Sequence, residues 1–130
     1  MVRSGTGREV FVAVGEPTLT LPLELTTKRS KGALGEGGRS QHLALLMAKA
    51  MAGDEHMAFL AAGTDGTDGP TNAAGGIVDG NTINELGAAT VDVEESLRRF
   101  DSFNALGKVT ARLETGPTDT NVTDLHLLAV

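Results

Sequence analysis

The sequence predicts an α/β domain in which helices cover both faces of a central mixed β-sheet, an α/β/α layered arrangement. Short apolar runs of strand length alternate along the chain with segments of helical pattern. The length of 130 residues is usual for a domain that buries its own core, so residues 1–130 are expected to form a single domain. The chain has no cysteine, which excludes disulfides, thiolate nucleophiles and cysteine-bound zinc.

Two strands are predicted near the N-terminus, over residues 8–15 (REVFVAVG) and 18–25 (TLTLPLEL), because both runs are rich in β-forming residues. The second run alternates leucine with polar residues and contains Pro22, which has no N–H group to donate. We therefore expect residues 18–25 to form an edge strand. Residues 26–38 are polar and glycine-rich without periodicity, which predicts a mobile loop.

A helix is predicted over residues 40–52, where Ser40 is suited to cap the start and Gly53 follows the end. The segment is apolar nearly all round, so we expect it to be covered on more than one side. Residues 57–63 (MAFLAAG) form a continuous apolar run that predicts a central strand buried on both faces. The loop after this strand then lies at its carboxyl end, where open α/β sheets bind ligands.

Three short helices are predicted further along, beginning near Asn81, Asp92 and Asp101, which are residue types that cap helix starts. Two strands follow, over residues 109–116 and 124–130, separated by a loop rich in Gly, Thr, Asp and Asn. This order of strands and helices predicts the mixed sheet.

The charge balance limits the kinds of partner. A net charge of -6 argues against a nucleic-acid surface, which needs clustered Lys and Arg. No apolar run reaches the roughly 20 residues of a membrane span, and the N-terminus lacks the apolar stretch of a signal peptide. We therefore expect no nucleic-acid or membrane partner and a cytoplasmic location. Lys28, Arg29, Lys31 and Arg39 form a basic cluster suited to one small anion, although such clusters are often simply solvated.

The first candidate site is the stretch GEGGRSQ, residues 35–41. Gly37 and Gly38 expose backbone N–H groups just before a helix start, and Arg39 adds a fork of donors, which together suit a phosphate or carboxylate. The alternative is an ordinary glycine-rich loop. The stretch is neither a Walker A loop nor a dinucleotide fingerprint, because the Gly-Lys-Ser/Thr and the third glycine are missing.

The second candidate site is AAGTDGTDGPTNAAGGIVDG, residues 61–80, in which two Thr-Asp-Gly triplets follow each other. Asp65 and Asp68 are suited to bind Mg²⁺ through water, to orient a hydroxyl group or to take its proton. The alternative is two consecutive tight turns with no ligand. The spacing excludes an EF-hand, because Gly69 stands where an oxygen ligand is needed. A third stretch, residues 115–124 (TGPTDTNVTD), repeats the Gly-Pro-Thr sequence.

Four stretches together resemble the MOFRL domain, the smaller C-terminal domain of class II glycerate 2-kinases. They match in content and order: GEPTLTL, GEGGRSQHLAL, AAGTDGTDGPTNAAGGIVDG and TGPTDTNVTDL. The resemblance implies an α/β layer structure packed against a larger nucleotide-binding domain, with the active site in the cleft between the two. The complete enzyme transfers the γ-phosphoryl group of ATP to the 2-hydroxyl of D-glycerate with Mg²⁺.

The resemblance also implies residue roles. The family's cleft arginine falls on Arg39 and its cleft aspartate on Asp65, and we keep Asp65 as a candidate contact for Mg²⁺. The expected substrate- or phosphate-binding residues are Gly37, Gly38, Thr64, Asp68, Thr118 and Asn121. The sequence departs from the family at Ser40 and His42, where Asn and Glu are usual.

The leading hypothesis is a detached MOFRL domain that contributes one side of a glycerate-kinase active site and is inactive or nearly so alone. Its expected partner is an N-terminal nucleotide-binding domain or a second copy of the chain. ATP and Mg²⁺ belong to the complete enzyme, and the chain alone is expected to require neither. A rival hypothesis is a free-standing, non-catalytic module for a small carboxylate or phosphate, which a homodimer covering the apolar helix would favour. A hydroxypyruvate reductase ranks last, because no dinucleotide fingerprint exists.

Overall fold

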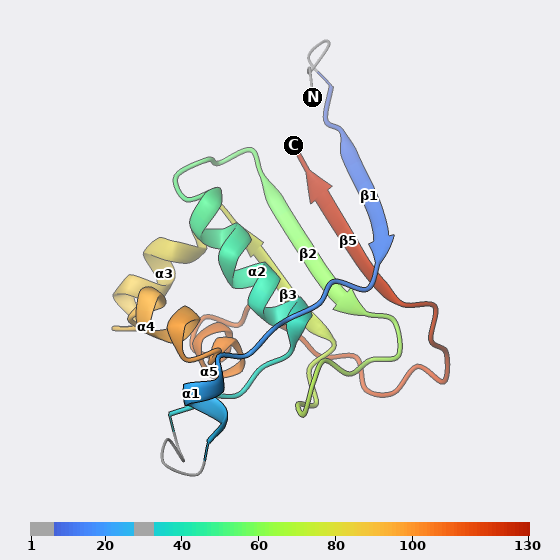
Figure 1. Cartoon of the computed structure of the whole chain (residues 1–130). Helices are drawn as coiled ribbons and strands as arrows, with labels where there is room; N and C mark the ends of the chain where they lie inside the picture. The colour runs from blue at the N-terminus through green and yellow to red at the C-terminus, as the bar shows by residue number, and fades with distance from the viewer. Residues whose placement is uncertain (1–6, 28–32) are drawn as a thin grey trace.

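A single β-sheet forms the centre of the structure, a computed structural model that describes residues 7–27 and 33–130 (Figure 1). Its strands are β1 (Val10–Gly15), β2 (Ala58–Gly63), β3 (Gly75–Asp79), β4 (Arg112–Leu113) and β5 (Asp124–Ala129). The helices are α1 (Leu23–Thr26), α2 (Arg39–Ala50), α3 (Thr82–Ala88), α4 (Val93–Arg98) and α5 (Ser102–Gly107). The strand order is β1-β5-β2-β3-β4, so the last strand along the chain separates β1 from β2.

The sheet is antiparallel in every pairing between the strands described above. Gly15 at the end of β1 and Gly63 at the end of β2 both lie opposite Asp124 at the start of β5. Three chain segments far apart in sequence therefore meet at one end of the sheet, where β1 and β2 end and β5 begins. The predicted α/β class is confirmed, but the expectation of a mixed sheet is wrong, because β5 runs against both of its neighbours.

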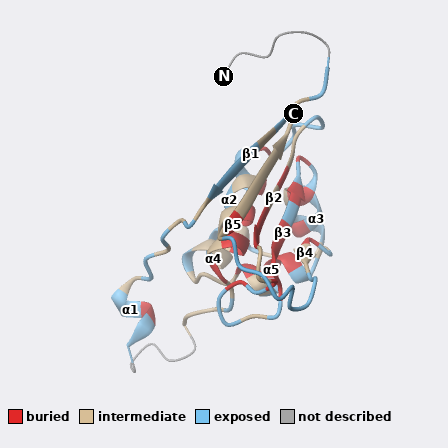
Figure 2. Cartoon of the chain, turned by 90° about the vertical axis from the view of Figure 1, so that its right-hand side faces the viewer, coloured by how far each residue is buried: buried red, intermediate tan, exposed pale blue. Residues whose placement is uncertain are grey.

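The helices α2 to α5 gather on one face of the sheet, where α2 packs on β2 and β3 and contacts α3, α4 and α5 (Figure 1). The core between these layers is fully buried at Leu45, Leu86 and Leu106 (Figure 2). Residues on the other face are more exposed, as Ile77 of β3 shows at 45%. The described helices and strands thus form two layers, not the three of the predicted α/β/α arrangement, and the predicted cover on α2 comes from the sheet and its neighbouring helices.

Most predicted elements are confirmed, including the strands at 8–15 and 57–63, the helix at 40–52 and the three short helices. The predicted edge strand at 18–25 is wrong: residues 18–22 belong to no helix or strand, and α1 begins at Leu23. Its expected neighbour, β1, pairs instead with β5. The sequence analysis also missed β3, whose first two residues are glycines, and the predicted strand at 109–116 is only Arg112–Leu113.

The segment before α2 is fixed by the helices that follow it in the chain. The N–H of Gly35 donates to the carbonyl of Arg99 at 2.7 Å, and the N–H of Glu36 donates to a carboxylate oxygen of Asp101 at 2.9 Å. Residues 28–32 lie outside the described residues. The predicted mobility of the loop over residues 26–38 therefore stays a prediction.

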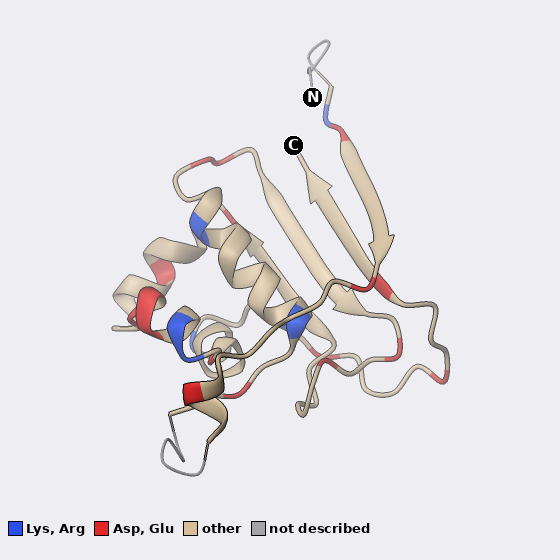
Figure 3. Ribbon diagram, in the orientation of Figure 1, with Lys and Arg blue, Asp and Glu red and all other residues tan. Residues whose placement is uncertain are grey.

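Charged side chains are concentrated on helices and loops, and β1 and β2 contain none (Figure 3). Of the predicted basic cluster, only Arg39 is described, since Lys28, Arg29 and Lys31 fall within residues 28–32. None of the described helices combines the length and the apolar character that crossing a bilayer requires.

Candidate functional site

A hollow of about 760 Å³ lies where β1 and β2 end and β5 begins. Its walls come from the segments 16–21, 37–39, 65–69 and 121–124. The predicted motifs, separated by up to about a hundred residues in sequence, thus share one cavity because the strand order brings their ends together. The loop after β2 lies at the carboxyl end of that strand, as predicted.

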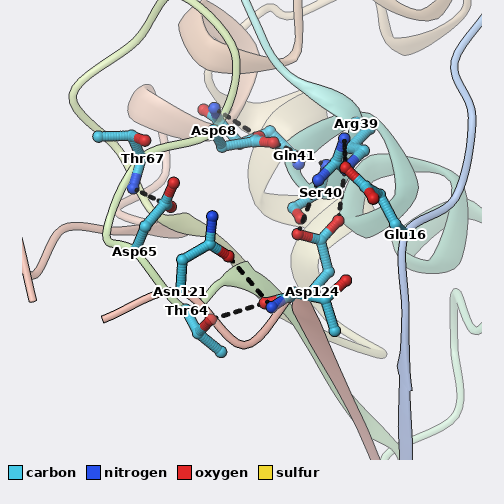
Figure 4. A network of polar contacts seen from close by, with 11 residues as sticks. Glu16, Arg39, Ser40, Gln41, Thr64, Asp65, Thr67, Asp68, Asn121 and Asp124 are labelled. Carbon is cyan, nitrogen blue, oxygen red and sulfur yellow. Dashed lines mark hydrogen bonds and ion pairs between the residues drawn. The ribbon is translucent and has the colours of Figure 1, made fainter. Parts of the chain in front are cut away.

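Arg39, the first residue of α2, is held by a carboxylate from β5 (Figure 4). Its Nε donates to Oδ2 of Asp124 at 2.5 Å and its Nη2 donates to Oδ1 at 3.1 Å. Glu16, which follows β1, places Oε1 3.2 Å from Nη1 of the same guanidinium. The hydrogen bonds to Asp124 raise the pKa of Arg39 above its already high ordinary value, so the guanidinium stays charged. Three segments are therefore joined through one side chain.

Asp68, in the second Thr-Asp-Gly triplet, caps the start of α2. Its Oδ1 accepts from the N–H of Ser40 at 2.9 Å, and its Oδ2 accepts from the N–H and the side-chain amide of Gln41 at 2.8 and 2.9 Å. A helix start attracts an anion, and here the protein supplies it. Ser40 lies inside the helix and is not the N-cap that the sequence predicted; that position is Gly38.

Gly38 is needed for this internal contact. A Cβ atom at position 38 would lie 2.3 Å from Cγ of Asp68, much closer than real Cβ atoms approach. Glycine therefore allows a carboxylate of the same chain to approach the backbone, the close approach for which glycine is commonly used. Gly37 and Gly38 both line the hollow, and a role in binding a ligand stays a prediction for each.

Asp65, in the first triplet, has a different environment. Its Oδ1 accepts from the N–H of Thr67 at 3.0 Å, which stabilises a tight turn, and Gly66 follows with φ of 88°. Its other oxygen, Oδ2, has no hydrogen bond among the described residues, and the half-exposed side chain lies on the wall of the hollow (Figure 4). The two triplets thus have different roles. Asp68 of the second triplet caps α2, and Asp65 of the first triplet leaves one carboxylate oxygen facing the hollow.

The remaining predicted residues, Thr64, Thr118 and Asn121, lie in the loop after β2 and the loop before β5, and hydrogen bonds join these two loops. The hydroxyl of Thr64 donates to the carbonyl of Thr123 at 2.7 Å, and the hydroxyl of Thr118 donates to the carbonyl of Thr64. Asn121 accepts from the N–H of Thr123 at 3.1 Å and lines the hollow, whereas Thr64 and Thr118 do not. The structure therefore leaves Thr64 and Thr118 off the lining of the hollow, and contact of these three residues with a ligand stays a prediction.

The sequence analysis missed two residues of this site, Glu16 and Asp124. Asp124 stands in the last of the four motifs, and its side chain is only 4% exposed. A carboxylate at the start of a mostly apolar strand was a signal, because buried charges are almost always paired. Its partner was not visible in sequence, since Arg39 lies 85 positions earlier.

The charged groups around the hollow are mostly negative. Four carboxylates, from Glu16, Asp65, Asp68 and Asp124, face one guanidinium, that of Arg39. Such a balance favours a hydroxyl group or a cation over a free anion. No three histidine or carboxylate side chains converge as metal ligands within residues 7–27 and 33–130. Asp65 alone fits the way Mg²⁺ is commonly held, by one or two carboxylates together with substrate phosphates.

The fold and the hollow together define a small α/β domain that presents a carboxylate-rich wall at one edge of its sheet. Residues 9–124 match the MOFRL family. The chain belongs to the MOFRL family.

Known relatives agree with this assignment. The chain is 57% identical over 91 residues to the D-glycerate 2-kinase of Thermotoga maritima, covering 70% of this chain and 22% of that protein. It is 42% identical over 121 residues to the glycerate 2-kinase of Pyrococcus horikoshii, covering 93% and 25%. A crystal structure of the Thermotoga maritima glycerate kinase has a TM-score of 0.83 at 45% identity, covering 93% of this chain and 27% of that chain. The chain thus spans about a quarter of the length of these relatives.

Proposed function

We propose that this domain forms one wall of a glycerate 2-kinase active site and works together with a nucleotide-binding domain that forms the other wall. The observation that carries the proposal is that Arg39 and Asp65, the two residues assigned to the cleft by resemblance, line the same hollow. The two relatives named above are glycerate 2-kinases, and their sequences align with most of this chain. This similarity supports a glycerate-kinase role for the domain.

In this proposal Asp65 acts on the hydroxyl group of the substrate. Its Oδ1 is fixed by the N–H of Thr67, and its Oδ2 is available to accept a hydrogen bond from the 2-hydroxyl of D-glycerate. A carboxylate in that position orients the attacking oxygen and takes its proton as the phosphoryl group is transferred. The local turn keeps the carboxylate in place before the substrate binds.

Arg39 binds the carboxylate of the substrate in the same arrangement. A guanidinium has five N–H groups, and Asp124 takes one from Nε and one from Nη2. The groups left on Nη1 and Nη2 point away from Asp124, and Nη1 meets only the exposed carboxylate of Glu16. Displacing Glu16 frees these N–H groups for a substrate carboxylate, and Asp124 keeps the guanidinium plane fixed during the exchange.

The phosphate groups of ATP need positive charge that this wall does not offer. Phosphoryl transfer is catalysed mainly by positioning and by charge stabilisation around the transferred group. We assign those positive groups to the nucleotide-binding domain and to Mg²⁺. The same negative balance argues against the rival hypothesis in its phosphate form, because this wall alone offers a phosphate one guanidinium among four carboxylates.

A chimera tests this proposal. Residues 9–124 of the chain replace the matching segment of the Thermotoga maritima D-glycerate 2-kinase, and ATP-dependent phosphorylation of D-glycerate is measured. We expect an active chimera in which Asp65→Asn lowers kcat by about 100-fold or more, the usual size of a lost general base. Glu55→Gln is the matched control, because this exposed carboxylate lies outside the hollow and should leave kcat unchanged. A folded chimera without activity, or equal effects of the two substitutions, contradicts the proposal.

A further inference from the structure

The outer edge of β1 is an unprotected sheet edge. β1 is the first strand in the order β1-β5-β2-β3-β4, so one of its sides has no strand beside it among the described residues (Figure 1). Proteins usually protect such an edge with a lysine, a proline, a bulge or a very short strand. β1 has none of these features: it runs for six residues, VFVAVG, in unbroken register with β5. The opposite edge of the sheet is protected, because β4 has only two residues.

The backbone groups that β1 leaves unpaired belong to its three valines. Glu9 exchanges both backbone hydrogen bonds with Val130, at 3.1 and 2.9 Å. In an antiparallel pair such residues alternate with residues whose N–H and C=O groups point to the other side. Val10, Val12 and Val14 therefore direct their N–H and C=O groups toward the open edge.

The side chains of the same valines are exposed as well. Val10, Val12 and Val14 are 62%, 63% and 64% exposed, and they share the face of the sheet that no described helix covers. Free backbone groups and apolar side chains thus coincide on one strip at the edge of the sheet. This combination is what a strand-adding partner requires, since the backbone supplies affinity and the side chains supply contact area.

We propose that this edge binds the β1 strand of a second copy of the chain, so that two sheets join into one across a two-fold axis at Val12. In this antiparallel register Val12 lies opposite the partner copy's Val12, and Val10 lies opposite Val14. Each valine pair then exchanges both of its backbone hydrogen bonds. The axis is perpendicular to the sheet, so the exposed valines of both copies lie side by side on the same face.

Charge complementarity favours this register. The two-fold axis that pairs position 12 with itself also places Arg8 of one copy opposite Glu16 of the other, on both sides of the dimer. Opposite charges that face each other across strands stabilise a sheet, and like charges destabilise it. Glu9 faces Gly15 in the same register, so no two carboxylates meet directly. A shift by two residues would lose both Arg8–Glu16 pairs and would leave one of the three valines without a valine opposite it.

The molecular mass in solution tests the proposal on the full chain. We expect light scattering and sedimentation equilibrium to give twice the 13.4 kDa mass of the chain at high concentration, with dissociation on dilution. Val12→Lys should reduce the mass to that of the monomer, because two ammonium groups would meet at the axis. Arg8→Glu should raise the dissociation constant several-fold by placing like charges opposite each other.

Ile77→Lys is the matched control, since Ile77 is an exposed apolar residue on the same face but on β3, away from the edge. It should leave the dimer intact. Circular dichroism and thermal unfolding verify that each variant folds. Amide hydrogen exchange adds a direct readout, in which the amides of Val10, Val12 and Val14 are protected in a concentration-dependent way.

Three results would overturn the proposal. A chain that remains monomeric at every concentration contains no such interface. Loss of the dimer in the Ile77→Lys variant would assign the contact to the sheet face and not to the β1 edge. Protection of the valine amides only after addition of the nucleotide-binding domain of a relative would assign the edge to that domain. These outcomes are separate from the test of the kinase proposal, because Val12 and Arg8 lie outside the hollow and Glu16, which lines it, is unchanged in every variant.

Discussion

Asp124 and Arg39 form a two-point ion pair that connects the first residue of β5 to the first residue of α2. The carboxylate is almost completely buried, at 4% exposure, and the guanidinium is 36% exposed. A buried charge is tolerated only when it is paired, so each residue fixes the other. Asp124 thus sets the orientation of the proposed substrate-binding arginine before any substrate binds.

This pair predicts coupled effects on stability. Arg39→Ala should lower the free energy of unfolding by about 1–3 kcal/mol, because it leaves Asp124 buried without a cation, while water partly compensates on the exposed side. Asp124→Asn should cost a similar amount. The double variant should cost clearly less than the sum of the two, as urea unfolding of all four proteins will show. Additive effects would mean that the two side chains do not interact in solution.

The two aspartates of the Thr-Asp-Gly triplets should respond differently to substitution. Asp68→Ala removes three hydrogen bonds at the start of α2 and should lower the free energy of unfolding by about 2–3 kcal/mol. Asp65→Ala removes one turn contact and should cost less than about 1 kcal/mol. Thermal and urea unfolding give both values. The reverse order would show that Asp65, and not Asp68, supports the fold.

A methyl group at position 38 should disturb the same cap. Gly38→Ala places Cβ 2.3 Å from Cγ of Asp68, and the carboxylate must move, at a cost of about 1–3 kcal/mol. Gly87→Ala is the control, since nothing lies within 4 Å of its Cβ position in α3. That variant should gain about 0.5–1 kcal/mol from the lower entropy of the unfolded chain. Equal stabilities of the two variants in urea would argue against the close contact at Gly38.

His42 predicts a loss of stability in mild acid. Its ring stacks on Phe100 with centroids 4.7 Å apart, and burial lowers its pKa below the ordinary value of 6.5. As the pH falls below about 6.5, the unfolded chain binds a proton that the folded chain binds less readily. The free energy of unfolding from this group is therefore greatest above pH 6.5 and decreases as the pH falls through the lowered pKa.

Two histidine variants isolate this effect. His42→Gln should flatten the fall in melting temperature between pH 7 and pH 5, and His56→Gln, which changes an exposed side chain, is the control. Differential scanning fluorimetry across this range gives the comparison. An unchanged pH profile in the His42→Gln protein would contradict a buried, neutral imidazole.

The elements that could be predicted from sequence are those whose pattern is local. The apolar run of β2 and the helical segment of α2 carry their own periodicity, and Asp92 caps α4 by accepting from the N–H of Glu95, three residues away. By contrast, α2 is capped by Asp68 from 28 residues further along, so the nearby Ser40 was a misleading signal. Local pattern reveals a cap only when the capping residue is a neighbour in sequence.

The errors in the sheet have a similar cause. The alternating leucines of residues 18–25 predicted a strand, but residues 18–22 pair with no strand and Leu23–Leu25 belong to α1, so the alternation alone was a misleading signal. β3 was missed because Gly75 and Gly76 are poor strand formers. At Gly75 a side chain would lie 1.8 Å from the carbonyl oxygen of Ala61, so packing between strands selects glycine there. Such requirements appear only in the folded sheet.

The position of β5 between β1 and β2 also constrains the order of folding. β1 has no partner until the chain has passed through every other described strand, since β5 follows them all in sequence. The α2, β2 and β3 unit can therefore form before β5 is available. Until then, β1 has no strand partner on either side. Closure of the sheet by β5 also brings Asp124 to Arg39, so completing the sheet and orienting the arginine depend on the same strand.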